Sequence, residues 1–326
     1  MSSGQYSTAA PGTFVVSLDF ELAWGTRGRP AQSRVGPWLA GAREAIRQML
    51  DLFTEFEISA TWATVGALLM AQPGGTKRHR MLSPSRYRDI PPGDHLTAPD
   101  WYAEDVLQWI LDCPVTQELG CHTLTHLYVD SRTEGREEFA DELDLFLELF
   151  EELQLPRPRS FVFPKAYQAH FSLLAERGFC SYRGPENRWF ERLPGTLPAA
   201  SFRWLDCALA LSPQVDRSVL TPAGLWEIPA SQFYSPFMGV GSKVPMKSRV
   251  RKAEKGLDIA AQRGGVFHLW THPFNMGCNT GELMDGLRKI LQRVGQLREQ
   301  NRLQTMSMGG LTERLNCSTR ERTQND

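Results

Sequence analysis

Apolar runs alternate with amphipathic stretches along most of the chain. The run at residues 13–20, Thr-Phe-Val-Val-Ser-Leu-Asp-Phe, is nearly continuous, as in a strand that is buried on both faces of a parallel sheet. Residues 38–56 instead carry apolar side chains at helical spacing. The same criteria predict further strands at 58–65, 118–121, 160–163, 179–183, 225–228 and 265–272, and further helices at 101–111, 134–153, 170–177, 247–263 and 282–300. About seven strands that alternate with helices predict an α/β fold of the βα-barrel kind.

The barrel domain is expected to span residues 13–311, between a flexible N-terminus at 1–12 and a flexible tail at 312–326. Asp100 is the expected N-cap of the helix that follows it. Residues 72–99 form a polar stretch that is long for a loop in a compact domain. We therefore expect a lid or a substrate-facing insertion there.

Bulk composition narrows the classes of function. Of the 326 residues, 41% are hydrophobic, so the chain can bury a sizeable core. A formal net charge of −1 argues against non-specific binding to nucleic acid or to anionic membranes. The acidic face of the helix at 134–153 and the basic face of the helix at 247–263 are expected to be solvated surface.

The sequence also bears on location. No run of about 18 apolar residues is present, so no transmembrane helix is expected. Residues 1–12 lack the basic and apolar regions of a signal peptide. The six cysteines form no Cys-x-x-Cys pair, which fits reduced thiols better than a disulfide framework. These features together predict a cytoplasmic protein.

Polar side chains follow several predicted strands at their carboxyl ends. Asp19 and Glu21 lie two residues apart at the end of the first strand, so both point to the same face. Two such acids are costly unless they hold a metal or a proton, and the alternative is a pair of solvated loop acids. Lys165 follows the strand at 160–163. His272 ends the last strand, and His268 faces the same side and can equally be a packed strand histidine.

His122 and His126 lie four residues apart, directly after the strand at 118–121. On a helical turn such positions share one face, so both imidazoles could bind one cation, although the pair alone could be a coincidence. Imidazole suits Zn, Fe, Ni or Co better than Mg or Ca. Two histidines and one carboxylate, with positions left open for water, form a hydrolytic metal site. We expect one divalent metal ion, with Zn favoured and Co, Ni, Fe or Mn as alternatives.

Five sequence blocks together make the chain resemble the polysaccharide deacetylase family, the NodB-type carbohydrate esterases. The blocks are Ser-Leu-Asp-Phe-Glu at 17–21, Ala-Thr-Trp-Ala-Thr-Val-Gly at 60–66, Leu-Gly-Cys-His-Thr-Leu-Thr-His at 119–126, Phe-Val-Phe-Pro-Lys at 161–165 and His-Leu-Trp-Thr-His-Pro at 268–273. The resemblance covers roughly residues 13–275, and His-Thr-Leu-Thr-His matches the family's H-[ST]-x-x-H pair. It implies a distorted (β/α) barrel with fewer strands than eight.

The resemblance also implies roles for the polar residues. His122 and His126 would be metal ligands together with Glu21, Asp19 would be the general base and His272 the general acid. The chain departs from many members of the family, which have two adjacent aspartates where this chain has one residue between its two acids. The exchanged assignment, with the aspartate as ligand and the glutamate as base, therefore stays open.

A second departure concerns the cation that orients the base. Many members carry an arginine in the fourth block, where the nearest cation of this chain is Lys165, a point charge and not a planar fork. Arg183 could substitute for it, or could be a surface or packing arginine. With these two, Trp24, Tyr167 and His268 complete the expected substrate-binding set. A backbone N–H near Tyr167 is the expected donor to an oxyanion.

The expected activity is that of a metal-dependent hydrolase that removes an N-acetyl group from an amino sugar. A cytoplasmic location favours a nucleotide-linked or lipid-linked sugar, or a polysaccharide precursor, as the substrate. One alternative is another C–N amide hydrolase on the same barrel, allantoinase-like or imide-hydrolase-like, because a fold does not fix a substrate. Another is a non-catalytic relative that binds a carbohydrate or a metal. No nucleic acid partner is expected, and the sequence does not indicate an oligomeric state.

Overall fold

The computed structural model describes residues 10–27, 35–70, 90–129, 131, 135–186, 199–211, 213–237 and 242–325. The strands in these ranges are β1 (Gly12–Phe20), β2 (Thr61–Thr64), β3 (Glu118–Cys121), β4 (Ser160–Phe161), β5 (Ser181–Glu186), β6 (Val219–Leu220), β7 (Trp226–Ala230), β8 (Gln232–Phe233), β9 (Val266–Thr271) and β10 (Leu303–Met306). The α-helices are α1 (Gly36–Glu55), α3 (Glu104–Leu111), α4 (Arg136–Glu152), α5 (Phe171–Glu176), α6 (Ala199–Leu209), α7 (Met246–Arg263), α8 (Thr280–Glu299) and α9 (Met308–Asn325). Short 3-10 helices follow β1, β2, β4 and β9 at Leu22–Thr26, Gly66–Leu69, Pro164–Ala166 and Pro273–Met276.

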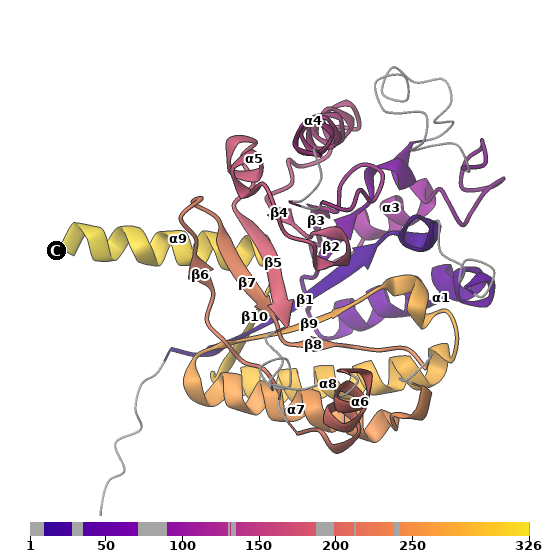
Figure 1. Cartoon of the computed structure of the whole chain (residues 1–326). Helices are drawn as coiled ribbons and strands as arrows, with labels where there is room; N and C mark the ends of the chain where they lie inside the picture. The colour runs from indigo at the N-terminus through magenta and orange to yellow at the C-terminus, as the bar shows by residue number, and fades with distance from the viewer. Residues whose placement is uncertain are drawn as a thin grey trace, which may run out of the picture.

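One sheet contains all of these strands, in the order β6-β7-β5-β4-β3-β2-β1-β9-β8, with β10 beside β1. The β6–β7 pair is antiparallel, and the other pairings are parallel. β1 lies at the centre of the molecule (Figure 1), with β9 along one edge. β10 and β2 share the other edge, at the amino-terminal and carboxyl-terminal halves of β1. Every residue of β1 is buried, as its continuous apolar run predicts.

A single extended segment, Trp226–Phe233, links the two sides of the sheet. Its first part, β7, pairs with β5, and its second part, β8, pairs with β9. Between the two parts, the N–H of Ser231 donates to the carbonyl of His268 at 2.9 Å. The sheet therefore curls back on itself, and the predicted distorted barrel is confirmed. The predicted number of strands was too low because β6 and β8 have two residues each and β10 has four, too few to show a periodic pattern.

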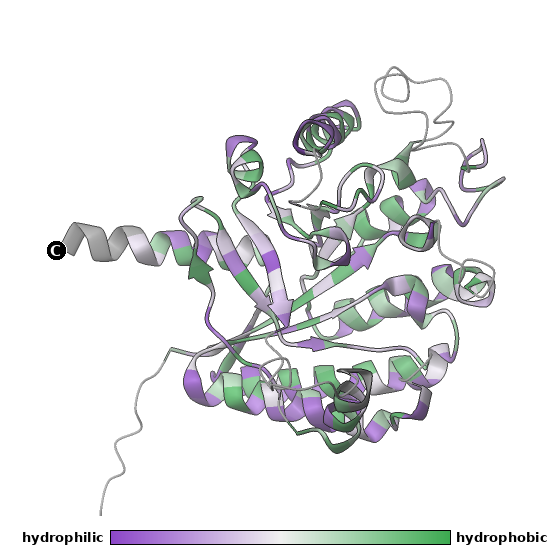
Figure 2. Cartoon of the chain, viewed as in Figure 1, coloured by the Kyte–Doolittle hydropathy of each residue, from purple (hydrophilic) through white to green (hydrophobic). Residues whose placement is uncertain are grey.

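The helices cover the barrel from outside (Figure 1). α7 and α8 pack against each other on one side, while α4 and α5 lie on the opposite side. Figure 2 shows hydrophilic and hydrophobic residues alternating along α1, α7 and α8, as expected of helices with one face in the core. The core residues that α1 contributes include Leu39, Ala42, Ile46, Met49 and Phe53, which match the predicted apolar stripe.

Two boundaries differ from the prediction. Asp100 does not cap α3, which begins at Glu104 after Ala103, because the N–H groups of Trp101 and Tyr102 both donate to the carbonyl of Ala98 in a turn that precedes the helix. A further helix, α9 (Met308–Asn325), includes residues 312–325 of the segment for which a flexible tail was expected, and Figure 1 shows it extending away from the barrel.

The start of α9 is held by the barrel. Met308 and Leu311 pack with Val15 and Ile228 in a small apolar cluster. The N–H of Gly309 also donates to Oε2 of Glu118 at 2.8 Å. Residues 72–89 of the expected lid at 72–99 lie outside the described residues. None of the described helices has the length and apolar character needed to cross a membrane.

Candidate active site

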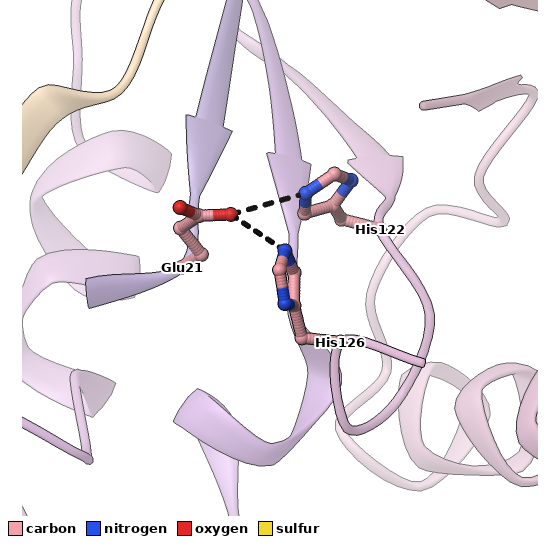
Figure 3. Close-up of side chains that lie close together, drawn as sticks. All are labelled: Glu21, His122 and His126. Atoms are coloured by element: carbon pink, nitrogen blue, oxygen red, sulfur yellow. Dashed lines mark hydrogen bonds and ion pairs between the residues drawn. The ribbon is translucent and has the colours of Figure 1, made fainter. Parts of the chain in front are cut away.

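Three side chains from two loops meet at the carboxyl edge of the sheet (Figure 3). Glu21 directly follows β1, and His122 and His126 follow β3. Oε2 of Glu21 lies 3.2 Å from Nε2 of His122 and 2.8 Å from Nε2 of His126. All three residues are buried, and their ligand atoms lie within 4.8 Å of one another. Two imidazoles and a carboxylate in this arrangement could hold one metal ion.

The backbone that presents the two histidines is a loop and not the predicted helical turn. β3 ends at Cys121, and Thr123 and His126 have φ angles of 63° and 58°. Left-handed backbone costs a non-glycine residue about 1–2 kcal/mol, so other contacts must hold this loop. The N–H of Gly66 donates to the carbonyl of Thr123 at 3.1 Å, and the N–H of Leu127 donates to the Thr123 hydroxyl at 2.8 Å. The shared direction of the two imidazoles therefore comes from these contacts.

The hydrogen bonding of His122 fits a cation between the three side chains. Its Nδ1 lies 2.7 Å from the carbonyl oxygen of Val162, which can only accept a hydrogen bond, so Nδ1 carries the proton. In the neutral ring, Nε2 then directs its lone pair towards the carboxylate of Glu21. Two lone pairs that face each other at 3.2 Å repel unless a proton or a metal ion lies between them. The donor set therefore fits a divalent metal, and the carbonyl of Val162 fixes the tautomer that can bind it.

The electrostatics favour the ligand forms of these groups. Burial alone would raise the pKa of Glu21, but the attraction of His126 and His272 outweighs burial and holds that pKa well below its usual range. Burial lowers the pKa of His126 despite the opposing effect of Glu21. At neutral pH, Glu21 is therefore a carboxylate and His126 is a neutral imidazole, the forms that bind metal.

Asp19 is held by Arg183, which binds both of its carboxylate oxygens at 2.5 and 2.7 Å. Both side chains are buried. Burial alone would raise the pKa of Asp19, but the charge of Arg183 lowers the pKa below its usual value. The guanidinium also lies 4.3 Å from the ring centroid of Trp270 and donates to the hydroxyl of Ser17 at 3.0 Å. Of the two cations that the sequence offered for orienting Asp19, Arg183 and not Lys165 makes the contact.

His268 lies behind this pair and not in the wall of the cleft. It is fully buried, and its Nε2 lies 2.8 Å from the hydroxyl of Ser17. Burial lowers the pKa of His268 to about 3, so the ring stays neutral in the neutral range. The expected direct contact between His268 and a substrate is therefore corrected to a packing role beneath Arg183.

His272 follows β9 directly and lies beside both carboxylates. Its Nε2 is 3.4 Å from Oε1 of Glu21 and 3.6 Å from Oδ2 of Asp19. Three aromatic rings surround the imidazole, with centroids at 5.6, 5.8 and 5.8 Å: Phe233, Trp270 and Phe274. The side chain is 21% exposed, so it can be reached from the cleft while its flanks stay apolar.

These groups lie at the base of a cleft of about 860 Å³. Lys165 and Tyr167, two of the expected substrate-binding residues, line it, and the ammonium of Lys165 lies 3.8 Å from the ring centroid of Tyr128. Trp24 does not line the cleft, so its expected substrate contact is corrected. It is buried in the core, and its indole N–H donates to the carbonyl of Trp101 at 3.0 Å.

Several lining residues were not selected from the sequence. They are Phe233, Trp270, Phe274, Asn275 and Glu186, whose Oε1 accepts a hydrogen bond from the Trp270 indole at 2.7 Å. Trp270, Phe274 and Asn275 lie within three residues of His272, which is the signal that could have identified them. Phe233 and Glu186 come from distant segments that only the fold brings to the cleft.

Comparison with solved structures places this fold among the polysaccharide deacetylases. A protein from Mycobacterium smegmatis that is assigned as a polysaccharide deacetylase aligns with a TM-score of 0.64 and 16% identity, over 97% of this chain and 93% of that one. A protein with the same assignment from Pseudomonas aeruginosa PAO1 aligns with a TM-score of 0.56 and 11% identity, over 92% and 89% of the two chains. Puue allantoinase aligns with a TM-score of 0.57 and 12% identity, over 94% and 91%.

The predicted NodB-type polysaccharide deacetylase fold is therefore confirmed. No family model matches the sequence. No curated protein matches it either. At these identities, the similarity extends to the fold alone, because a fold does not fix an activity.

Proposed function

We propose that the protein is a metal-dependent hydrolase that removes the N-acetyl group from an amino sugar. One observation carries the proposal: the two-histidine, one-carboxylate group lies beside a paired acid, Asp19, and an accessible imidazole, His272. The two distances from His272 Nε2, 3.4 Å to Glu21 and 3.6 Å to Asp19, mean that all three side chains face a common point at the base of the cleft. A hydrolase of an unactivated amide needs a metal ion, a general base and a general acid close together.

A divalent metal held by Glu21, His122 and His126 would lower the pKa of a water to roughly 7 and would polarise the amide carbonyl. Two side chains of the protein then carry out the two proton transfers, Asp19 as the base and His272 as the acid. Arg183 keeps Asp19 ionised and orients both of its oxygens, so that Asp19 accepts the proton of the attacking water. Because its low pKa makes this carboxylate a weak base, the attacking water must itself be acidified.

His272 is the donor to the leaving amine. An amine is a poor leaving group until its nitrogen is protonated, and the imidazole lies beside both carboxylates, where it is reached from the cleft. The aromatic rings around it exclude water from its flanks, which strengthens its interaction with the carboxylates. Lys165 and Tyr167 would contact the sugar at the wall of the cleft.

A second candidate is hydrolysis of another C–N bond, as in an allantoinase. It is favoured by the alignment with Puue allantoinase, whose TM-score of 0.57 matches that of the Pseudomonas aeruginosa protein at 0.56. In that case the bond that is hydrolysed belongs to a cyclic amide and not to an acetamide. The metal ion, the general base and the general acid would have the same roles.

The test is a measurement of acetate release from N-acetylated sugars that are free, nucleotide-linked or polymeric, with allantoin and a cyclic imide as competing substrates. We expect acetate release that a chelator abolishes and that an added divalent metal restores. Ring opening of allantoin without acetate release supports the second candidate. Stoichiometric metal with no hydrolysis of any of these amides contradicts both candidates.

A further inference from the structure

One acid on α4 departs from the expectation that the acidic face of this helix is solvated surface. Phe139, Leu143 and Phe146 form its buried stripe, and Glu142 lies on the same stripe with 0% exposure. A buried carboxylate is costly unless several hydrogen bonds compensate for the lost hydration. An apolar side chain would fill the position with a smaller loss of hydration free energy. Packing alone therefore does not explain an acid at this position.

The partner of Glu142 is the loop between the two ligand histidines. Oε2 of Glu142 accepts a hydrogen bond from the N–H of Thr125 at 2.7 Å, and Oε1 accepts one from the Thr125 hydroxyl. Thr125 immediately precedes His126. One side chain from a rigid helix therefore fixes both the backbone and the side chain of the residue next to a ligand.

This contact lies in the part of the loop whose backbone conformation is intrinsically unfavourable. Thr123 and His126 lie on either side of Thr125 and are both left-handed, at φ 63° and 58°. Such a backbone persists only when its surroundings over-determine it. Thr123 is tied through its carbonyl to Gly66 and through its hydroxyl to Leu127. The hydrogen bonds of Glu142 add a restraint at the second half of the loop, adjoining His126.

We propose that Glu142 is a positioning residue for the metal site, and that it holds His126 in the orientation that a metal needs. The inference rests on the proposed metal-dependent function. Outer residues that orient ligands commonly change metal affinity by about 10–100-fold when they are removed. Two neutral hydrogen bonds are sufficient for this role, because a glutamine could accept from the Thr125 N–H and donate to the Thr125 hydroxyl, whose proton can rotate away.

The experiment titrates metal-free protein with Co²⁺ and records both the dissociation constant and the visible absorption bands, which report coordination geometry. We expect Glu142→Leu to weaken Co²⁺ binding by about 10–100-fold and to alter the bands. Glu142→Gln should restore both to within a few-fold of the unmodified protein. Glu148→Leu, on the exposed side of the same helix, is the matched control and should change neither.

Thr125→Val provides a second test that keeps the buried volume of α4 intact. It removes the hydroxyl donor and should change the Co²⁺ bands in the same direction as Glu142→Leu, by a smaller amount. The inference would be overturned if Glu142→Leu bound Co²⁺ with the same affinity and the same absorption bands as the unmodified protein. If Glu142→Leu does not fold, the same result in Thr125→Val would overturn it. An equal loss in Glu142→Gln and Glu142→Leu would also overturn it, because charge and not positioning would then be the cause. Failure of the unmodified protein to bind Co²⁺ would instead remove the proposed metal site and the inference with it.

Discussion

Arg183 binds both carboxylate oxygens of Asp19 from a strand four positions away in the sheet. Such a planar fork fixes both the position and the rotation of the carboxylate, which a lysine ammonium cannot do. The aromatic face of Trp270 and the hydroxyl of Ser17 hold the guanidinium in turn. The direction in which Asp19 presents its free lone pairs is therefore determined by Arg183.

Arg183→Lys should lower kcat by about 100-fold, the usual consequence of misplacing a reacting group by about 1 Å. Metal content should be unchanged, because the triad of Glu21, His122 and His126 does not include this residue. Initial rates and elemental analysis of the purified variant check both expectations. An unchanged kcat in this variant would show that Asp19 does not need a guanidinium to orient its carboxylate.

The sequence predicted that the acids and histidines of the candidate site lie together because they stand at or just after the ends of buried strands, and parallel strands bring their carboxyl ends to one edge. It did not distinguish Arg183 from Lys165, because the contact with Asp19 depends on how β5 is placed in the sheet. Lys165 follows the strand nearer in sequence to the histidines, but its backbone has a φ of 55° and its ammonium lies over Tyr128.

Glu142 was missed for a different reason. Its helix carries many acids, and the acidic pattern favoured a solvated face. The position i+3 from Phe139 and i−4 from Phe146 indicates the core, but only the tertiary fold supplies the Thr125 donors that make a buried acid tolerable there. The helical turn predicted for His122 and His126 was wrong because their spacing alone does not specify the backbone, and the left-handed residues that replace the turn have no sequence signature here.

Asp19→Asn and Glu21→Gln should separate the roles of the two acids. Asp19→Asn should keep the metal and lose about 10²–10⁴-fold in turnover, the usual contribution of a positioned proton-transfer group. Glu21→Gln should lose metal affinity, because an amide is a poorer ligand than a carboxylate for a cation beside two neutral imidazoles. Metal content and initial rates of both variants check this. The opposite result, with metal lost in Asp19→Asn and kept in Glu21→Gln, would exchange the two assignments.

Lys165→Met should raise KM for the accepted substrate by about 10-fold and leave kcat nearly unchanged. The ammonium lies at the wall of the cleft, above the Tyr128 ring, where it can donate to a bound sugar or its carrier. A hydrogen bond from a charged group contributes about 1.5–3 kcal/mol, and 1.4 kcal/mol corresponds to a factor of ten. Lys247→Met, at an exposed position on α7, is the matched control. A fall in kcat at constant KM would place Lys165 in the chemical step instead.

His268 should make the protein less stable in acid. Its pKa is about 3 in the folded protein, against about 6.5 for an unburied histidine, so between these values the unfolded chain binds a proton that the folded chain does not. The free energy of unfolding therefore falls as the pH falls below about 6.5, by up to about 1.4 kcal/mol per pH unit for this residue. Its contribution is complete above pH 6.5 and decreases towards pH 3.

His268→Gln removes this titration and retains a polar group opposite Ser17. Urea unfolding of metal-free protein at pH 8, 7, 6 and 5 should show a shallower loss of stability for the variant than for the unmodified chain. The difference at pH 8 measures the constant cost of the substitution, since His268 is neutral there in both states. The change in that difference between pH 7 and pH 5 isolates the protonation of His268. Equal slopes for the two proteins would mean that His268 is reached by solvent protons in the folded state, contrary to its complete burial.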